Sequence, residues 1–187
     1  MGSDKASLPI GDSTFLAHII DELKGAFAPV IVVAAPDGTQ RLTFQPSPNL
    51  VIVYDDTPFE GPVHALLTGL LAGQGEYAFA CSCDLPLVRA EVATALGAML
   101  DQHDAVIPRL GGRLQMLHAV YRPGCAIALE AMKQSGERRL HAVIDHINAK
   151  IVDEEIIRRI DPELTSFYNV NTPENYRAAI AIAAGRS

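Results

Sequence analysis

The sequence predicts an α/β fold in which helices cover both faces of a mostly parallel sheet. Runs of continuous apolar residues, typical of strands buried on both faces, alternate along most of the chain with segments whose apolar residues recur at helical spacing. The 187 residues show no repeat, linker or low-complexity stretch, and this length is usual for one domain. We therefore expect a single domain over residues 1–187.

Strands are predicted where short segments are rich in β-branched or small apolar residues. These segments are residues 30–35, 51–54, 77–83, 105–108, 114–121 and 166–170. Only the turn Gly111-Gly112 separates the fourth segment from the fifth, which favours antiparallel pairing of those two. Residues 1–11 are polar and turn-prone, so no strand is expected there.

Helices are predicted where apolar residues recur every three or four positions. The segments are residues 15–23, 62–71, 89–102, 125–134 and 137–148, with a last helix after residue 172. Pro62 suits the first turn of its helix, where a missing amide donor is harmless. Asn171 or Thr172 can cap the last helix, and Glu174 favours the positive end of its dipole.

Composition argues against a nucleic-acid partner and a membrane partner. The chain has 15 Lys and Arg against 22 Asp and Glu, a net charge of −7, and no basic run to neutralise a phosphate backbone. No apolar stretch approaches the ~20 residues of a membrane span, and no signal-peptide pattern opens the chain. We therefore expect a cytoplasmic protein. The cysteines and histidines lack the close spacing of a zinc site.

The stretch 79–88 carries the strongest chemical signal, because an apolar run ends there in a lone carboxylate, Asp84. Ligands of an open parallel sheet lie outside the carboxyl ends of its strands, so Asp84 would face a substrate or a metal. Pro86 forces the chain out of the sheet at this point. A carboxylate in this position suits Mg²⁺. The alternative is that Asp84 caps the helix that starts near Arg89.

Three loops with polar or turn residues follow predicted strands, at residues 55–62, 84–86 and 169–173. If the strands are parallel, these loops gather at one edge of the sheet and form a site for a metal and a polar ligand. Lys5 is the basic residue near the start of the chain that could supply a point charge for a phosphate. The alternative is that Lys5 is an exposed, solvated lysine.

Four ordered motifs in these segments resemble those of the molybdenum cofactor guanylyltransferases, within the wider MobA-like nucleotidyltransferase group. The motifs are Met1-Gly-x-Asp-Lys-Ala-x-Leu, Asp55-x-x-Pro-x-x-Gly61-Pro62, Cys83-Asp84-x-Pro86 and Asn169-x-Asn171-Thr-Pro-Glu. Residues 112–122 and 136–140 are also similar to that family, and the likeness runs over nearly the whole chain. Four motifs in order are more specific than any one of them.

The resemblance implies a Rossmann-like three-layer nucleotidyltransferase fold and an enzyme that uses GTP and Mg²⁺. The enzyme would attach GMP to the terminal phosphate of molybdopterin, form molybdopterin guanine dinucleotide and release pyrophosphate. GTP and molybdopterin would be substrates, and molybdoenzymes or their chaperones would be candidate protein partners. The alternatives are a related cytidylyltransferase or other nucleotidyltransferase, and a non-catalytic protein that binds molybdopterin or a partner.

The same resemblance assigns a role to each candidate site residue. Lys5 would meet the GTP phosphates, and Asp84 would hold Mg²⁺; these two are the predicted catalytic residues. Asn169 and Asn171 would lie beside the reacting phosphates and the pterin phosphate. Two further residues, at the 55–62 loop, would line the nucleotide and product site: Asp55 and Gly61. His118, in the segment 112–122, would either contact the pterin or only pack in the core.

The chain departs from the family at its start. Members of the family open with a strand and a Leu-Ala-Gly-Gly-x-Ser-x-Arg loop directly before the motif that begins here at Met1. The first strand is central in a doubly wound sheet, so we expect a gap lined by two unpaired strand edges. We hypothesise that the natural protein is longer and that Met1 is an internal methionine. Without the loop, guanylyl transfer should be badly impaired.

Overall fold

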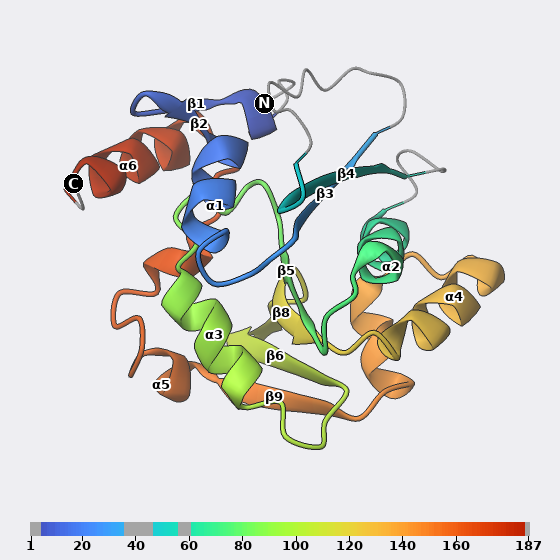
Figure 1. Ribbon diagram of the computed structural model, residues 1–187. Coiled ribbons are helices and arrows are strands. Elements are labelled where there is room, and N and C mark those ends of the chain that lie inside the picture. The colour runs from blue at the N-terminus through green and yellow to red at the C-terminus, as the bar shows by residue number, and fades with distance from the viewer. Residues whose placement is uncertain (1–4, 36–46, 56–60, 186–187) are drawn as a thin grey trace.

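The computed structural model describes residues 5–35, 47–55 and 61–185, which fold into strands and helices (Figure 1). Two small sheets lie beside a larger one. The first is the hairpin of β1 and β2, and the second pairs β3 with β4 in parallel. Their bounds are β1 Pro9–Ile10, β2 Ser13–Thr14, β3 Val30–Ala34 and β4 Leu50–Tyr54.

The larger sheet has five strands and is mixed, so the predicted mostly parallel sheet is wrong. Its strands are β5 Ala78–Cys81, β6 Ala105–Leu110, β7 Arg113–Leu114, β8 His118–Tyr121 and β9 Ala149–Asp153. Strand β8 lies between β5 and β6 and runs antiparallel to both, whereas β9 runs parallel to β6. The reason is the turn Gly111-Gly112, where φ angles of 53° and 77° reverse the chain within two residues.

Two apolar layers cover the opposite faces of this sheet, as predicted. Alternate residues of β6 and β8 belong to different layers: Ile107 and Tyr121 pack with α2 and α4, whereas Val106 and Val120 pack with α3 and α5. This alternation follows from the two-residue period of a strand. The helices are α2 Pro62–Ala72, α3 Ala90–Ala98, α4 Cys125–Ser135 and α5 Glu154–Ile157.

The remaining helices are α1 Phe15–Leu23 and α6 Pro173–Ala184, which pack near the N-terminal hairpin, and three 3₁₀ turns. The turns are η1 Lys5–Ser7, η2 Leu140–Asp145, which packs with α4, and η3 Thr165–Phe167. Thr172 caps α6, since its hydroxyl accepts a hydrogen bond from the Asn175 amide at 3.2 Å. Among the described residues, no helix combines the length and the apolar character needed to cross a membrane.

Three predicted elements are corrected. The helix over 137–148 is only the short η2, and β9, which the sequence pattern missed, follows it. The strand over 166–170 is instead the turn η3, because the Asp161 carboxylate accepts the Ser166 amide and holds that segment curled. The segment 1–11 does contain a strand, β1, whose register with β2 places Ile10 opposite Ser13.

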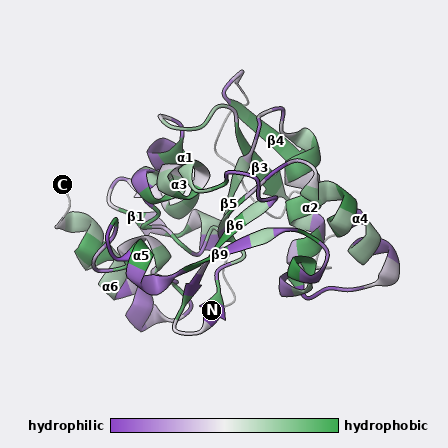
Figure 2. Ribbon diagram, turned by 90° about the horizontal axis from the view of Figure 1, so that it is seen from below, coloured by the Kyte–Doolittle hydropathy of each residue, from purple (hydrophilic) through white to green (hydrophobic). Residues whose placement is uncertain are grey.

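Among the described residues, a gap without strand pairing separates the β3–β4 sheet from the larger sheet. Within the described residues, β3 pairs only with β4, and β5 pairs only with β8. All four β5 residues are half-buried, although the sequence predicted a strand buried on both faces. Figure 2 shows that the strands on the two sides of this gap are hydrophobic.

Candidate functional site

Asp84 lies just beyond the carboxyl end of β5, where the chain leaves the sheet. The Leu85 amide donates to the Ser82 carbonyl at 3.2 Å, which closes a turn around Asp84. The Asp84 carbonyl accepts the Val170 amide at 2.8 Å and so ties this turn to the segment that carries the two asparagines. Asp84 does not cap α3. The N-cap residue of that helix is Arg89, and the Ala90 amide in the first turn donates to the Glu22 carboxylate at 2.9 Å.

Four of the predicted site residues meet in one hydrogen-bonded cluster, which we call the Asp84 cluster: Lys5, Asp84, Asn169 and Asn171. Asp84 Oδ2 accepts Asn169 Nδ2 at 3.1 Å and lies 3.4 Å from Lys5 Nζ. The Lys5 ammonium also donates to Asn171 Oδ1. The Lys5 side chain is 26% exposed, so it is not the solvated lysine of the alternative interpretation.

The second carboxylate oxygen of Asp84 is the atom of the cluster that could bind a cation. Asp84 Oδ1 is buried and has no hydrogen-bond partner among the described residues. A buried carboxylate oxygen is costly without a partner, so this atom fits a ligand for a hard cation. The described residues contain no group of three or more His, Cys, Asp or Glu that could hold a metal. One carboxylate suits Mg²⁺, which fills its other positions with phosphate and water, and does not suit zinc.

The other two predicted site residues are positioned by different elements. Asp55 follows β4, and its amide donates to the Ala34 carbonyl at 2.9 Å. Gly61 precedes α2 with a φ of 99°, a conformation that favours glycine, and a Cβ there would lie 3.7 Å from the Arg138 carbonyl oxygen. The intervening residues 56–60 lie outside the described part of the chain. Participation of Asp55 and Gly61 in the site stays a prediction.

His118 packs in the core, which resolves the two interpretations of its role. The side chain is fully buried, and its ring lies 5.0 Å from Phe79 and 4.0 Å from Phe167 between centroids. Its Nε2 is 3.0 Å from the Ser166 hydroxyl. Burial lowers the pKa of His118 to about 3, because charging the imidazole there would cost its hydration.

A buried network around Ser166 supports the asparagine segment, and sequence reasoning missed it. The Ser166 hydroxyl accepts the Arg89 amide at 3.0 Å, and Asp161 Oδ2 accepts the Ser166 amide at 2.8 Å. Both acceptors are nearly inaccessible, with Asp161 at 1% and Ser166 at 0% exposure. The local sequence pattern does not predict these contacts, because the two pairs of residues are 5 and 77 positions apart in sequence.

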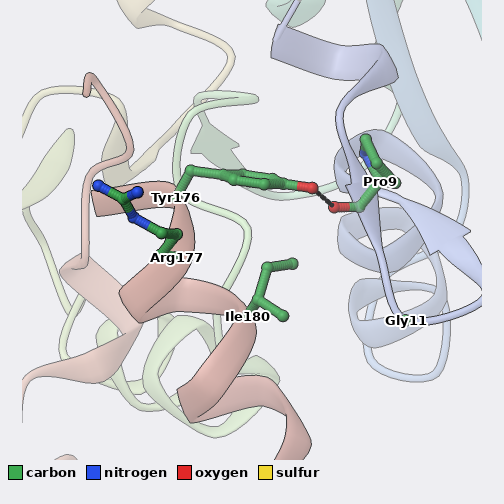
Figure 3. Close-up of a pocket in the computed structure, with 5 residues that line it drawn as sticks. All are labelled: Pro9, Gly11, Tyr176, Arg177 and Ile180. Carbon is green, nitrogen blue, oxygen red and sulfur yellow. Dashed lines mark hydrogen bonds between the residues drawn. The ribbon is translucent and has the colours of Figure 1, made fainter. Parts of the chain in front are cut away.

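Two cavities accompany these elements. A cavity of about 450 Å³ lies between β1 and α6. Figure 3 shows the residues that line it. Among them, the Tyr176 hydroxyl donates to the Pro9 carbonyl at 2.8 Å. Its lining includes none of the predicted site residues. The second cavity, about 430 Å³, follows the gap between β3 and β5 and reaches Ala6 and Cys83, the neighbours of Lys5 and Asp84 in sequence.

Comparisons with known proteins agree on one family. A family model described as "MobA-like NTP transferase domain" matches residues 1–151. Molybdenum cofactor guanylyltransferase from Desulfosudis oleivorans is 30% identical over 187 residues, which cover 99% of this chain and 90% of that protein. A probable molybdenum cofactor guanylyltransferase from Methanothermobacter thermautotrophicus is 33% identical over 183 residues, covering 95% of this chain and 91% of the relative.

Solved structures show the same fold. Molybdopterin-guanine dinucleotide biosynthesis protein A from Archaeoglobus fulgidus superposes with a TM-score of 0.82 at 21% identity, over 98% of this chain and 92% of that one. The 2-C-methyl-D-erythritol 4-phosphate cytidylyltransferase from Thermus thermophilus gives a TM-score of 0.73 at 15% identity, over 98% and 95%. The chain therefore has the Rossmann-like fold of nucleotidyltransferases, with a mixed sheet.

Proposed function

Because the chain belongs to the MobA-like NTP transferase domain family, we propose that it transfers GMP from GTP to the terminal phosphate of molybdopterin and releases pyrophosphate. Its product would be molybdopterin guanine dinucleotide. The resemblance read from the four motifs is confirmed by the family match, and the chain is a nucleotidyltransferase. The printed names of its curated relatives support guanylyl transfer to the molybdenum cofactor.

The observation that carries this proposal is the Asp84 cluster. It places one ammonium, one carboxylate and two amide groups within hydrogen-bond reach of each other beyond β5. Nucleotidyl transfer needs phosphates to be held in line and their negative charge to be neutralised, with little covalent chemistry from the protein. The composition of the cluster meets these needs, because its carboxylate suits a cation and its ammonium suits a phosphate.

The reaction can be assigned to the chain's own groups. A phosphate oxygen of molybdopterin attacks the α-phosphorus of GTP, the bond to the bridging β-phosphate oxygen breaks, and pyrophosphate leaves with that bond's electron pair. The Lys5 ammonium would turn from Asp84 toward the phosphate oxygens and stabilise the charge that develops on them. The amide groups of Asn169 and Asn171 would orient the reacting phosphates by hydrogen bonds.

We propose Mg²⁺ as the cofactor of this site. Nucleotidyltransferases of this family generally use a divalent metal, and the unpaired Asp84 Oδ1 would hold it. A bound Mg²⁺ would supply Lewis-acid stabilisation to the phosphate oxygens.

Asp55 and Gly61 would line the nucleotide and product side, as the resemblance implies. Molybdoenzymes or their chaperones would receive the product, and the protein would act in the cytoplasm.

A pyrophosphate-release assay tests the proposal, with GTP, molybdopterin and Mg²⁺ as reactants and CTP as the competing nucleotide. Asp84→Asn should lower the rate about 100-fold or more, because the charged ligand is lost while the shape is kept. Asp153→Asn is the matched control, since that exposed carboxylate lies at the end of β9 and pairs with Arg109. If both variants lost the same fraction of the rate, Asp84 would not be a residue of the active site.

Two further results of this assay would contradict the proposal itself. A faster reaction or tighter binding with CTP would reassign the base. Binding of molybdopterin without any pyrophosphate release, in the chain alone and in a form extended ahead of Met1, would make the protein a carrier instead of a transferase. Titration calorimetry with GTP and CTP measures the binding separately from the transfer.

A further inference from the structure

The two asparagines of the Asp84 cluster lie on a stretch of chain without secondary structure of its own. Residues 168–172 separate η3 from α6, and none of them belongs to a helix or a strand. Asn169 and Asn171 are exposed, whereas Val170 between them is fully buried. The directions of the two amide groups therefore depend on the contacts that hold the backbone on either side of them.

Two hydrogen bonds tie this stretch and η3 to the chain that follows Asp84. The Val170 amide donates to the Asp84 carbonyl at 2.8 Å, and the Arg89 amide donates to the Ser166 hydroxyl oxygen at 3.0 Å. The earlier residue of one segment thus meets the later residue of the other, so the two segments lie side by side in opposite directions. Asn169 lies between the two tied residues, Ser166 and Val170.

The Ser166 hydroxyl also joins this tie to the core. Its oxygen lies 3.0 Å from His118 Nε2. Because the oxygen accepts from the Arg89 amide, the hydroxyl proton is available to donate to this nitrogen. Burial lowers the pKa of His118 to about 3, so the ring stays neutral and keeps one acceptor nitrogen. The Ser166 amide donates to Asp161 Oδ2 at 2.8 Å. One buried residue is thereby held from the start of α3, from β8 and from the chain after α5.

We propose that Ser166 is a positioning residue for nucleotidyl transfer, because its hydroxyl holds the stretch that carries Asn169 in place beside Asp84. The inference rests on the proposed function and adds a residue that does not touch the substrates. Asn169 Nδ2 donates to Asp84 Oδ2 at 3.1 Å, so a shift of this stretch would change the cluster itself. Transfer depends on alignment of the reacting phosphates more steeply than binding does, and loss of the hydroxyl should therefore lower kcat more than it raises KM.

Ser166→Ala tests the proposal in the pyrophosphate-release assay, since it removes one oxygen and adds no bulk. The value of kcat should fall about tenfold or more, and KM for GTP should change less than about threefold. Asn169→Ala should lower kcat by itself. If Ser166 acts through Asn169, adding Ser166→Ala to Asn169→Ala should cost little more, whereas a general loss of stability would cost the same factor in both backgrounds.

Asp104→Ala is the matched control for the loss of a tertiary acceptor. The Asp104 carboxylate accepts the Asn148 amide at 2.8 Å, ahead of β6 and at the end of the sheet opposite to Asp84. This variant should lose stability and keep its kcat. A drop in kcat as large as that of Ser166→Ala would show that any lost tertiary hydrogen bond has the same effect, and the positioning role would be rejected.

Hydrogen exchange of the Val170 amide gives a readout that needs no substrate. In Ser166→Ala this amide should exchange about tenfold faster or more, because one of the two ties of its segment is lost. Amides of β6, which β8 and β9 flank, report the change in global stability. Acceleration of Val170 and β6 by one common factor would leave Ser166 with a contribution to stability only.

These measurements keep the failure of this proposal apart from the failure of the proposed function. If the unchanged protein released no pyrophosphate while Ser166→Ala still accelerated Val170 exchange, the transferase assignment would fail and the anchoring by Ser166 would stand. The positioning role itself is overturned by any of three results: unaltered Val170 exchange in Ser166→Ala, a rise in KM with kcat unchanged, or full additivity with Asn169→Ala.

Discussion

His118 should make the protein less stable as the pH falls below neutrality. The imidazole is fully buried, and burial lowers its pKa from 6.5 to about 3. Between these two pH values the unfolded chain binds a proton that the folded chain does not. The free energy of unfolding therefore decreases as the pH is lowered. Each pH unit below 6.5 contributes about 1.4 kcal/mol, and lowering the pH from 8 to 5 should therefore cost about 2 kcal/mol.

Urea unfolding followed by circular dichroism measures this loss. With an unfolding slope of roughly 2 kcal/mol per molar urea, the midpoint should fall by about 1 M between pH 8 and pH 5. His118→Gln removes the titrating group and should flatten this dependence, although it lowers the stability at every pH. The exposed His141→Gln is the matched control and should keep the full slope.

The window above pH 5 separates His118 from the carboxylates. Hydrogen bonds from Arg139 lower the pKa of Glu137 to about 2, and the Gly111 amide and Arg158 lower the pKa of Glu154. These groups bind protons in the unfolded chain only near and below pH 4.5, so their contribution is lost at lower pH. If the His118→Gln protein lost as much stability between pH 8 and pH 5 as the unchanged protein, the buried neutral imidazole would not be the cause.

Two further predictions concern stability. Thr172→Ala should lower the free energy of unfolding by about 1 kcal/mol, because the Asn175 amide loses its hydrogen-bond acceptor. Thr172→Ser keeps the hydroxyl and should keep most of this stability. An equal loss in both variants would assign the effect to the methyl group of Thr172. Gly97→Ala should destabilise the protein, although alanine normally favours a helix, because its Cβ would lie 2.6 Å from the Tyr77 hydroxyl and 2.7 Å from Cζ. In a Tyr77→Leu background the same change should become neutral or stabilising, and a thermal shift of unchanged sign there would reject the steric reason.

The sequence was sufficient to locate the Asp84 cluster because its signals are local. Asp84 and Pro86 follow β5, which ends at Cys81, and Pro173 begins α6 shortly after Asn171. Such signals indicate where a strand ends or a helix begins, although the asparagine segment follows the 3₁₀ turn η3 and not the predicted strand. The hydrogen bonds among Lys5, Asp84 and Asn171 follow from that placement.

The parts that could not be predicted depend on contacts far apart in sequence. Strand β9, Ala149–Asp153, follows the segment that the sequence pattern predicted as a helix, and its parallel register with β6 places it in the sheet. Likewise, Ser166 lies in an apolar segment that suits a strand, but the Asp161 carboxylate and the Arg89 amide hold it in a turn. Tertiary pairing overrides local propensity in both cases.

The charge balance of the Asp84 cluster limits how strongly the cluster attracts a phosphate. Lys5 and Asp84 cancel each other formally, and the net charge of −7 gives the chain no general attraction for phosphates. A nucleoside triphosphate therefore needs donors beyond Lys5. Asp84 Oδ1 has no hydrogen-bond partner among the described residues, so a cation bound there would supply positive charge next to Lys5. We therefore expect the cluster to bind a nucleoside triphosphate as its complex with a divalent cation and not alone.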